Sequence, residues 1–282
     1  MIEKEEKLMI RTDMHTHTFF SQDGREDLRN MLEKAVSLGL RYYGTSEHFD
    51  YDYWKRGLLI GGKQVRQIDA DAYFARARRL QREYADKIRY LVGCEFAYEN
   101  SSAAQELYLK TADKFKPDYI INSVHVCLGN DCYFPEFFAG KSKEYAYNAY
   151  LYRVLESLDA PYPYDVVGHI GYCSRNAVYK DAKLRYAEYA DVLDKILIKI
   201  IEKNKILEVN TSSKTAGSDF LPDTDILERY FSLGGRKVLF GSDAHDAFRI
   251  ADKREQVSAA LSKIGFTRLT VPVRGEFIQE EL

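Results

Sequence analysis

Six histidines are the residues of this 282-residue chain that most directly suggest chemistry. Each lies at or just past the end of a short apolar run that is typical of a β-strand, and most stand beside an acidic or small residue. Histidines with ordinary surface or core roles would also occur in helical segments, and none of the six does. The pattern therefore indicates one shared site. The six are His15, His17, His48, His125, His169 and His245.

Two pairs of these residues have the spacing of metal ligands. Residues i and i+2 project from the same face of an extended strand, so His15 and His17 can bind one ion together. Asp243 and His245 repeat this spacing near the end of the chain. Imidazoles and carboxylates suit Zn, Mn or Fe. Such groups are too many for one tetrahedral ion, so we expect two or three divalent ions, with Glu95 bridging two of them.

Three further acids lie near these histidines. Glu47 precedes His48, and we expect its carboxylate to orient a histidine rather than to bind metal. Asp13 is expected to hold the end of the first strand. Asp23 lies in the turn Ser21-Gln22-Asp23-Gly24, where an acid serves either as a ligand or as an ordinary turn residue.

The elements that must position these groups alternate regularly along the chain. Strands are expected at 9–13, 41–46, 88–94, 118–124, 165–168, 206–210 and 237–241. Helices are expected near 26–38, 71–85, 102–115, 142–158, 183–203, 223–233 and 252–264. Strand–helix repeats of this kind imply a parallel sheet with right-handed crossovers. Since no linker rich in Pro, Gly or Ser divides the chain, we predict one closed α/β barrel of seven strands that spans residues 1–282 as a single domain.

A barrel places the candidate ligands together, because the carboxyl ends of all its strands meet at one mouth. An open doubly wound sheet would show a glycine-rich phosphate turn after its first strand, and residues 13–20 contain none. The irregular stretch 50–70, which includes Trp54, is predicted to be a lid or specificity loop over the site. Residues 129–141 are the second segment expected to set selectivity.

Composition narrows the class of protein. The formal charge of −2 comes from 43 acids against 41 bases, so nucleic acid is not expected as a partner. The apolar stretches are too short for a membrane span, and residues 1–8 show no secretory signal. The cysteines form no C-x-x-C pair, so we interpret them as free thiols of a cytoplasmic protein. They are Cys94, Cys127, Cys132 and Cys173. The sequence makes no prediction of oligomeric state.

These motifs, in this order, resemble those of the polymerase-and-histidinol-phosphatase (PHP) superfamily, and more narrowly its histidinol-phosphate phosphatases. The resemblance covers nearly the whole chain. It rests on Asp13-Met-His15-Thr-His17, Ser46-Glu47-His48, Gly93-Cys-Glu95, Asn122-Ser-Val-His125, Gly168-His169-Ile170 and Gly241-Ser-Asp243-Ala-His245. It implies a distorted (β/α)7 TIM-like barrel whose trinuclear metal centre hydrolyses phosphate monoesters. The ligands it implies are His15, His17, Asp23, His48, Glu95, His125, His169, Asp243 and His245.

The resemblance also implies residues that bind the phosphate of a small substrate, most directly L-histidinol phosphate of histidine biosynthesis. Arg175 stands at the spacing of a phosphate-binding arginine after the Gly-His motif. The family carries a second arginine just after Asn-Thr, and here Asn210-Thr211 is followed by Ser212-Ser213-Lys214. Lys214 can supply a point charge instead, but this departure weakens the link to that particular substrate.

The mechanism expected is attack on phosphorus by a water that the ions activate. Asp243 and Glu95 would hold that water, and Asp243 or His245 would give a proton to the leaving oxygen. A nuclease or nucleotide phosphatase is the alternative enzyme, with Arg76-Ala-Arg78-Arg79-Leu-Gln-Arg82 as a basic segment. Hydrolysis of a C–N or C–O bond, or a non-catalytic metal-binding module, are further alternatives.

Overall fold

Parallel strands form the centre of the molecule, in a computed structural model that describes residues 9–51, 59–60 and 63–282. Within these residues one sheet has seven strands, in the order β1-β2-β5-β6-β9-β10-β11. All of its neighbouring pairs are parallel. The strands are β1 (Thr12–Asp13), β2 (Tyr42–Phe49), β5 (Arg89–Ala97), β6 (Tyr119–Ser123), β9 (Val166–Val167), β10 (Ile206–Asn210) and β11 (Val238–Gly241). Each lies within a range predicted from the sequence or overlaps it.

The first and last strands meet, which nearly closes the sheet into a barrel. The backbone N–H of Met14 donates to the carbonyl of Phe240 at 3.0 Å, and that of His17 donates to Ala244 at 2.8 Å. A parallel bridge joins Thr16 to Ala244. The predicted α/β barrel of seven strands is therefore confirmed.

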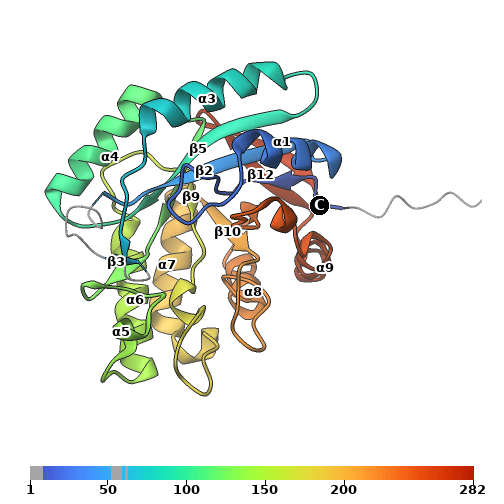
Figure 1. Cartoon of the computed structure of the whole chain (residues 1–282). Coiled ribbons are helices and arrows are strands. Elements are labelled where there is room, and N and C mark those ends of the chain that lie inside the picture. The colour runs from blue at the N-terminus through green and yellow to red at the C-terminus, as the bar shows by residue number, and fades with distance from the viewer. Residues whose placement is uncertain (1–8, 52–58, 61–62) are drawn as a thin grey trace, which may run out of the picture.

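Helices surround this barrel (Figure 1). The long helices of the described residues are α1 (Leu28–Ser37), α3 (Ala70–Glu83), α4 (Ser102–Phe115), α6 (Lys143–Ser157), α7 (Ala190–Glu202), α8 (Thr224–Ser232) and α9 (Arg254–Ile264). Side chains at the helix starts accept hydrogen bonds from first-turn N–H groups, as N-caps do. Asp27, Asp69, Ser101, Ser142 and Asp223 act in this way.

One predicted helix is shorter than its sequence pattern. The segment 183–203 becomes helical only at Ala190, and a 3-10 turn, η2 (Tyr186–Glu188), precedes it. Tertiary contacts explain the difference. The Tyr186 N–H donates to the Asp225 carboxylate at 2.8 Å, and Lys183 lies 2.7 Å from the Asp223 carboxylate. These bonds to the start of α8 hold the segment out of the helix.

The barrel interior is filled around one aromatic ring. Tyr119 points inward from β6, and its hydroxyl donates to the carbonyl of Met14 at 2.6 Å. A Cβ at Gly93 would lie 2.4 Å from this ring, and one at Gly44 would lie 2.3 Å from its hydroxyl. Only glycine fits at these two strand positions, because any larger residue would displace the ring.

A C-terminal hairpin that was not predicted covers the end of the barrel opposite the histidines. Its antiparallel strands are β12 (Arg268–Val273) and β13 (Glu276–Glu281). Val271 and Val273 pack in one buried cluster with Tyr42 and Tyr119, which begin β2 and β6. Short elements complete the fold: β3 (Leu59–Ile60), β4 (Lys63–Gln64), β7 (Val126–Cys127), β8 (Asn130–Asp131), α5 (Pro135–Phe138), η1 (Tyr172–Ser174) and η3 (Ala247–Arg249).

Two further features concern the cysteines and the helices. The cysteines Cys94, Cys127, Cys132 and Cys173 are buried free thiols. Among the described residues, no helix combines the length and apolar character needed to cross a membrane.

Candidate metal centre

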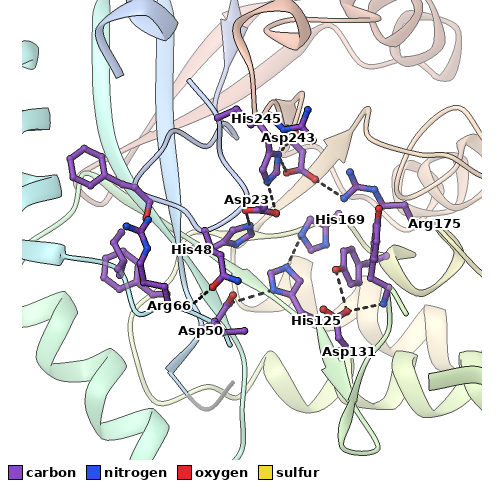
Figure 2. A pocket seen from close by; sticks show the side chains of 18 of the residues that line it. Asp23, His48, Asp50, Arg66, His125, Asp131, His169, Arg175, Asp243 and His245 are labelled. Carbon is purple, nitrogen blue, oxygen red and sulfur yellow. Dashed lines mark hydrogen bonds and ion pairs between the residues drawn. The ribbon is translucent and has the colours of Figure 1, made fainter. Parts of the chain in front are cut away.

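The carboxyl ends of the strands open into a cavity of about 490 Å³. Figure 2 shows the side chains that point into it, which come from segments far apart in the sequence. Those predicted from the sequence are Asp23, His48, His125, His169, Arg175, Lys214, Asp243 and His245. His15, His17 and Glu95 are fully buried next to them. The fold thus brings all the predicted site residues together.

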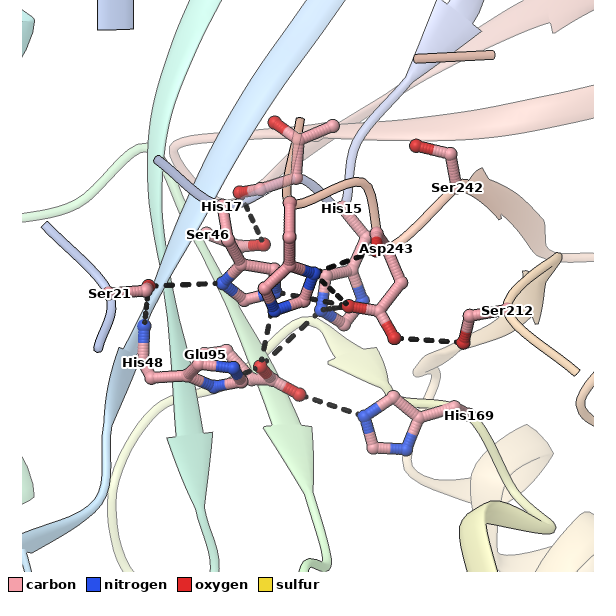
Figure 3. Close-up of polar contacts among 12 residues, drawn as sticks. His15, His17, Ser21, Ser46, His48, Glu95, His169, Ser212, Ser242 and Asp243 are labelled. Atoms are coloured by element: carbon pink, nitrogen blue, oxygen red, sulfur yellow. Dashed lines mark hydrogen bonds and ion pairs between the residues drawn. The ribbon is translucent and has the colours of Figure 1, made fainter. Parts of the chain in front are cut away.

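Glu95 lies at the centre of the cluster (Figure 3). Its Oε2 is 2.7 Å from His48 Nδ1, 3.4 Å from His15 Nε2 and 3.6 Å from His17 Nε2. Its Oε1 is 2.8 Å from His169 Nε2 and 3.2 Å from His125 Nε2. The two carboxylate oxygens therefore face different sets of imidazoles, which is the geometry that a bridging ligand requires.

Asp243 joins the histidines to the cationic side of the cavity. Its Oδ1 lies 3.3 Å from His17 Nε2, and its Oδ2 lies 3.2 Å from Arg175 Nη1. The hydroxyl of Ser212 also donates to Oδ2 at 2.9 Å. Burial alone would raise the pKa of Asp243, but Arg175 and the nearby histidines hold it well below its usual value. Its backbone is left-handed, with φ of 52°, a conformation that aspartate tolerates better than most residues.

Asp23 completes the outer side of the cluster. Its carboxylate lies 3.1 Å from His245 Nε2 and 3.7 Å from His48 Nε2. Partial desolvation would raise the pKa of Asp23, whose side chain is 54% exposed, but His245 and His48 lower it far below its usual range. The turn that carries Asp23 folds tightly, because a Cβ at Gly24 would lie 1.8 Å from the carbonyl oxygen of Thr18. Of the two sequence interpretations, this position favours the ligand over the ordinary turn residue.

The donor set fits divalent metal ions. Several buried ring nitrogens make no well-aligned hydrogen bond in the described part of the chain, although such atoms are almost always paired. They are His15 Nε2, His17 Nε2, His48 Nδ1, His169 Nδ1 and His245 Nε2. Some of them instead lie within ion-pair distance of a carboxylate. Four groups among the described residues bring their ligand atoms within 4.8 Å of one another. They are His17–His48–His245, His15–Glu95–His169, His15–His17–Asp243 and His48–Glu95–His125.

The pKa shifts of the histidines also indicate a site for cations. Burial alone would lower the pKa of the His48 imidazole, but Glu95 and Asp23 raise it to about 10. The buried Glu95 and the partly exposed Asp23 thus favour positive charge, which protons supply when metal is absent. Burial, with His48 and His245 nearby, lowers the pKa of His17 well below its usual value. A neutral imidazole is the form that binds metal, so binding here would displace protons from the other rings.

Two acids support the ligands, as expected from the sequence. Glu47 accepts hydrogen bonds from both the N–H and the hydroxyl of Thr18 and of Ser21, at 2.5 to 3.1 Å. The Ser21 Oγ in turn lies 3.2 Å from His17 Nδ1. Asp13 accepts bonds from the N–H groups of Ser242 and Ala251 at 3.0 and 2.8 Å. These contacts tie the loops that carry the ligands to the barrel.

Sequence reasoning missed Glu208, which lies beneath the centre on β10. Its Oε1 is 2.6 Å from His15 Nδ1, and its Oε2 accepts the N–H of His169 at 2.6 Å. One signal for it was present in the sequence. Glu208 stands between Leu207 and Val209 in a buried strand, and alternation places it on the same face as Asn210.

The two predicted phosphate-binding residues lie side by side against one tyrosine. Arg175 has a side chain that is only 11% exposed, and its buried Nε has no partner among the described residues. Lys214 is exposed, and its Nζ donates to the hydroxyl of Tyr133 at 2.8 Å. The Arg175 guanidinium also lies over the Tyr133 ring, 5.8 Å from the centroid of that ring. Tyr133 was not singled out in the sequence.

Both segments expected to set selectivity contribute to the cavity wall. Residues 129–141 provide Asp131, Tyr133 and Phe134. The stretch 50–70 provides Asp50, Tyr51, Val65, Arg66, Gln67 and Ile68. Trp54, the residue named for this loop, lies outside the described residues.

Comparison with known proteins agrees with the geometry. The sequence pattern of the PHP domain family matches residues 13–212 of the chain. The probable histidinol-phosphatase of Clostridium acetobutylicum is 29% identical over 236 residues, which cover 83% of this chain and 86% of that protein. The histidinol-phosphatase of Lactococcus lactis is 29% identical over 262 residues, which cover 93% of this chain and 94% of that protein.

A solved structure extends the likeness to three dimensions. The crystal structure of histidinol phosphate phosphatase from Lactococcus lactis, complexed with zinc, L-histidinol and phosphate, superposes with a TM-score of 0.81. The two chains are 27% identical, and the match covers 95% of this chain and 98% of that one.

Proposed function

The chain belongs to the PHP domain family, and on that premise we propose that it hydrolyses L-histidinol phosphate to L-histidinol and phosphate. The coarser description is a phosphoric monoester hydrolase that depends on divalent metal ions. The substrate rests on the relatives, which are named for this reaction, and on the structure from Lactococcus lactis that holds L-histidinol and phosphate. We further propose that the enzyme serves histidine biosynthesis in the cytoplasm.

One observation carries the proposal: Glu95 presents its two oxygens to separate sets of imidazoles at the base of a cavity that a buried arginine also lines. The proposed ligands of two or three Zn, Mn or Fe ions are His15, His17, Asp23, His48, Glu95, His125, His169, Asp243 and His245. Bound ions of this kind supply Lewis-acid chemistry, since they activate water at neutral pH and neutralise charge on a phosphate.

The residues of the chain have distinct proposed roles around the substrate. Arg175 binds phosphate oxygens through its planar guanidinium. Lys214 adds a second positive charge next to it, and its hydrogen bond to the Tyr133 hydroxyl holds that charge in place. Glu95 and Asp243 hold the attacking water in line with the leaving oxygen. Asp243 takes up the proton that the attacking water loses, and Asp243 or His245 then passes a proton to the leaving oxygen. Phosphoryl transfer needs such positioning and charge neutralisation more than covalent help from the protein.

No observation favours the nuclease alternative. Two arginines of the basic segment on α3 form internal ion pairs, Arg76 with Asp27 at 2.5 Å and Arg78 with Asp118 at 2.6 Å. Among the described residues that line the cavity, none comes from α3.

The test is elemental analysis followed by turnover. Protein loaded separately with Zn²⁺, Mn²⁺ or Fe²⁺ should hold two or three ions per chain and release phosphate from L-histidinol phosphate faster than from other phosphate monoesters. His17→Ala and Asp243→Ala should lose both metal and turnover. Fully metallated protein that hydrolyses other monoesters but not L-histidinol phosphate would refute the substrate. Metallated protein with no turnover across the panel would refute the enzyme itself.

A further inference from the structure

Glu208 is a buried acid at the base of the metal centre. It projects into the barrel from β10, and its side chain is fully buried. The neighbouring strand β11 leaves room for this side chain, because a Cβ at Gly241 would lie 2.2 Å from Glu208 Oε1 and 2.6 Å from His15 Cβ. Among the described residues, no lysine or arginine lies within ion-pair distance of this carboxylate, although buried acids are ordinarily paired with a cation.

The hydrogen-bond partners of Glu208 make it an acceptor, and this fixes where His15 carries its proton. The backbone N–H of His169 and the side-chain amide of Asn210 can only donate here, at 2.6 and 3.2 Å. The Asn210 amide is oriented by Ser212, whose N–H donates to Asn210 Oδ1 at 2.9 Å. A carboxylate that accepts these bonds also accepts from His15 Nδ1 at 2.6 Å. With metal bound, His15 would keep its proton on Nδ1, and its buried Nε2 would be free to bind the ion.

We propose that Glu208 is the positioning residue that holds one metal subsite in its binding form. Its two oxygens reach His15 and the backbone of His169, and these residues form a candidate metal group with Glu95. Glu208 fixes the tautomer of the His15 imidazole and the backbone position of His169. Its negative charge would lie on the side of His15 that faces away from the metal ion. The inference rests on the metal centre of the proposed function and is independent of its substrate.

Glu208→Gln is the variant that separates positioning from packing. Glutamine keeps the shape of the side chain but places an amide donor against either His15 Nδ1 or the His169 N–H. Metal-free protein should be titrated with Zn²⁺ in the calorimeter, and bound zinc counted by elemental analysis. We expect affinity for one ion to fall by roughly 10- to 100-fold, as for other carboxylates that orient metal-bound histidines. The thermal stability of the metal-free protein should not fall.

Two variants complete the design. Glu280→Gln removes a buried carboxylate that pairs with Arg41 at 3.0 Å, and it should bind zinc like the wild type. Glu208→Asp keeps the charge on a side chain that is one methylene shorter. Its affinity for zinc should therefore lie between those of the wild type and Glu208→Gln. Equal zinc binding by Glu208→Gln and wild type would overturn the proposal, as would failure of both Glu208 variants to fold with or without zinc. A wild-type protein that takes up none of Zn²⁺, Mn²⁺ and Fe²⁺ would instead overturn the proposed function.

Discussion

At the scale of single residues, the site gathers acids and imidazoles whose buried carboxylates, Glu95 and Asp243, call for positive charge nearby. Glu95, Asp23 and Asp243 lie among six imidazoles, and most of the partners are buried. Buried polar groups normally form hydrogen bonds, yet ring nitrogens of five histidines form none of good geometry among the described residues, and some only face a carboxylate. The arrangement is therefore better explained as a set of ligands than as a structural hydrogen-bond network.

Arg175 gives the first prediction at this scale. Arg175→Met should raise KM for the phosphate monoester by roughly 10- to 100-fold, because a hydrogen bond to a charged group contributes about 1.5–3 kcal/mol. Zinc content should stay at the wild-type value, since Ser212 still holds Asp243. Steady-state kinetics and elemental analysis provide the two measurements.

Lys214→Met is the matched comparison for that variant. Lys214 is exposed and bonds to the Tyr133 hydroxyl, so solvent screens its charge and its loss should raise KM less than the loss of Arg175. Zinc loss in Arg175→Met would show that this arginine supports the metal centre rather than the phosphate.

The sequence revealed the ligand candidates because imidazoles at strand ends are rare and easily counted. It did not reveal Glu208, Ser212 or Tyr133. Ser212 and Tyr133 are residue types that occur everywhere, and only their contacts with Asp243 and Lys214 single them out. Such supporting groups depend on which strands become neighbours, and that information is absent from local spacing.

At the scale of elements, the repeated strands and helices were predictable because each has its own hydrophobic periodicity. The C-terminal hairpin was not. Pro272 lies within β12, and proline argues against a strand when only the sequence is considered. The hairpin is stabilised by contacts with the barrel, where Val271 packs beneath Tyr119, and not by a pattern of its own.

Asp118 links this hairpin to the barrel, and its substitution tests how much the link stabilises the fold. Its carboxylate accepts bonds from Arg274 in the hairpin turn at 2.7 Å, from Arg78 of α3 at 2.6 Å and from the N–H of Val92 at 2.9 Å. Asp118→Asn should lower the free energy of unfolding at pH 7 by about 1–3 kcal/mol, since these bonds involve a charged group. Urea denaturation of metal-free protein measures the difference.

The pH dependence of that difference follows from the pKa of Asp118. Burial would raise this pKa, but the N–H of Val92 and the two arginines lower it below the usual 3.8. A lowered pKa in the folded state gives stability that is present above pH 3.8 and is lost as the pH falls further. The difference in the free energy of unfolding between wild type and Asp118→Asn should thus become smaller below about pH 4. A difference that stays constant down to pH 3 would refute the charge-based explanation.

At the scale of the whole molecule, we propose that residues 1–282 form one domain. A single buried cluster includes Leu28 of α1, Leu261 of α9 and the C-terminal Leu282. Because the core is continuous, zinc-loaded protein should unfold in one calorimetric transition whose van't Hoff and calorimetric enthalpies agree. Two resolved transitions would indicate separate units.

The metal centre also lies where the barrel closes, and this leads to the last prediction. His15 and His17 follow β1, while Asp243 and His245 follow β11, so shared ions would link the first and last strands. The backbone bonds of this seam are few: Met14 to Phe240, Asp243 to His15, His17 to Ala244 and, further along, Arg25 to His245. By contrast, β2 and β5 pair along their whole length, from Tyr42–Arg89 to Phe49–Phe96.

Removing the ions with a chelator should therefore loosen the seam before the rest of the sheet. Hydrogen exchange should speed up at the amides of His17 and Asp243, because local opening is easiest where few bonds hold two strands. The amides between β2 and β5 serve as the internal control and should change little. Restoring Zn²⁺ should restore protection at the seam. If chelation accelerates exchange equally in both places, or in neither, the ions do not close the barrel, and closure depends on the backbone and the packed interior around Tyr119.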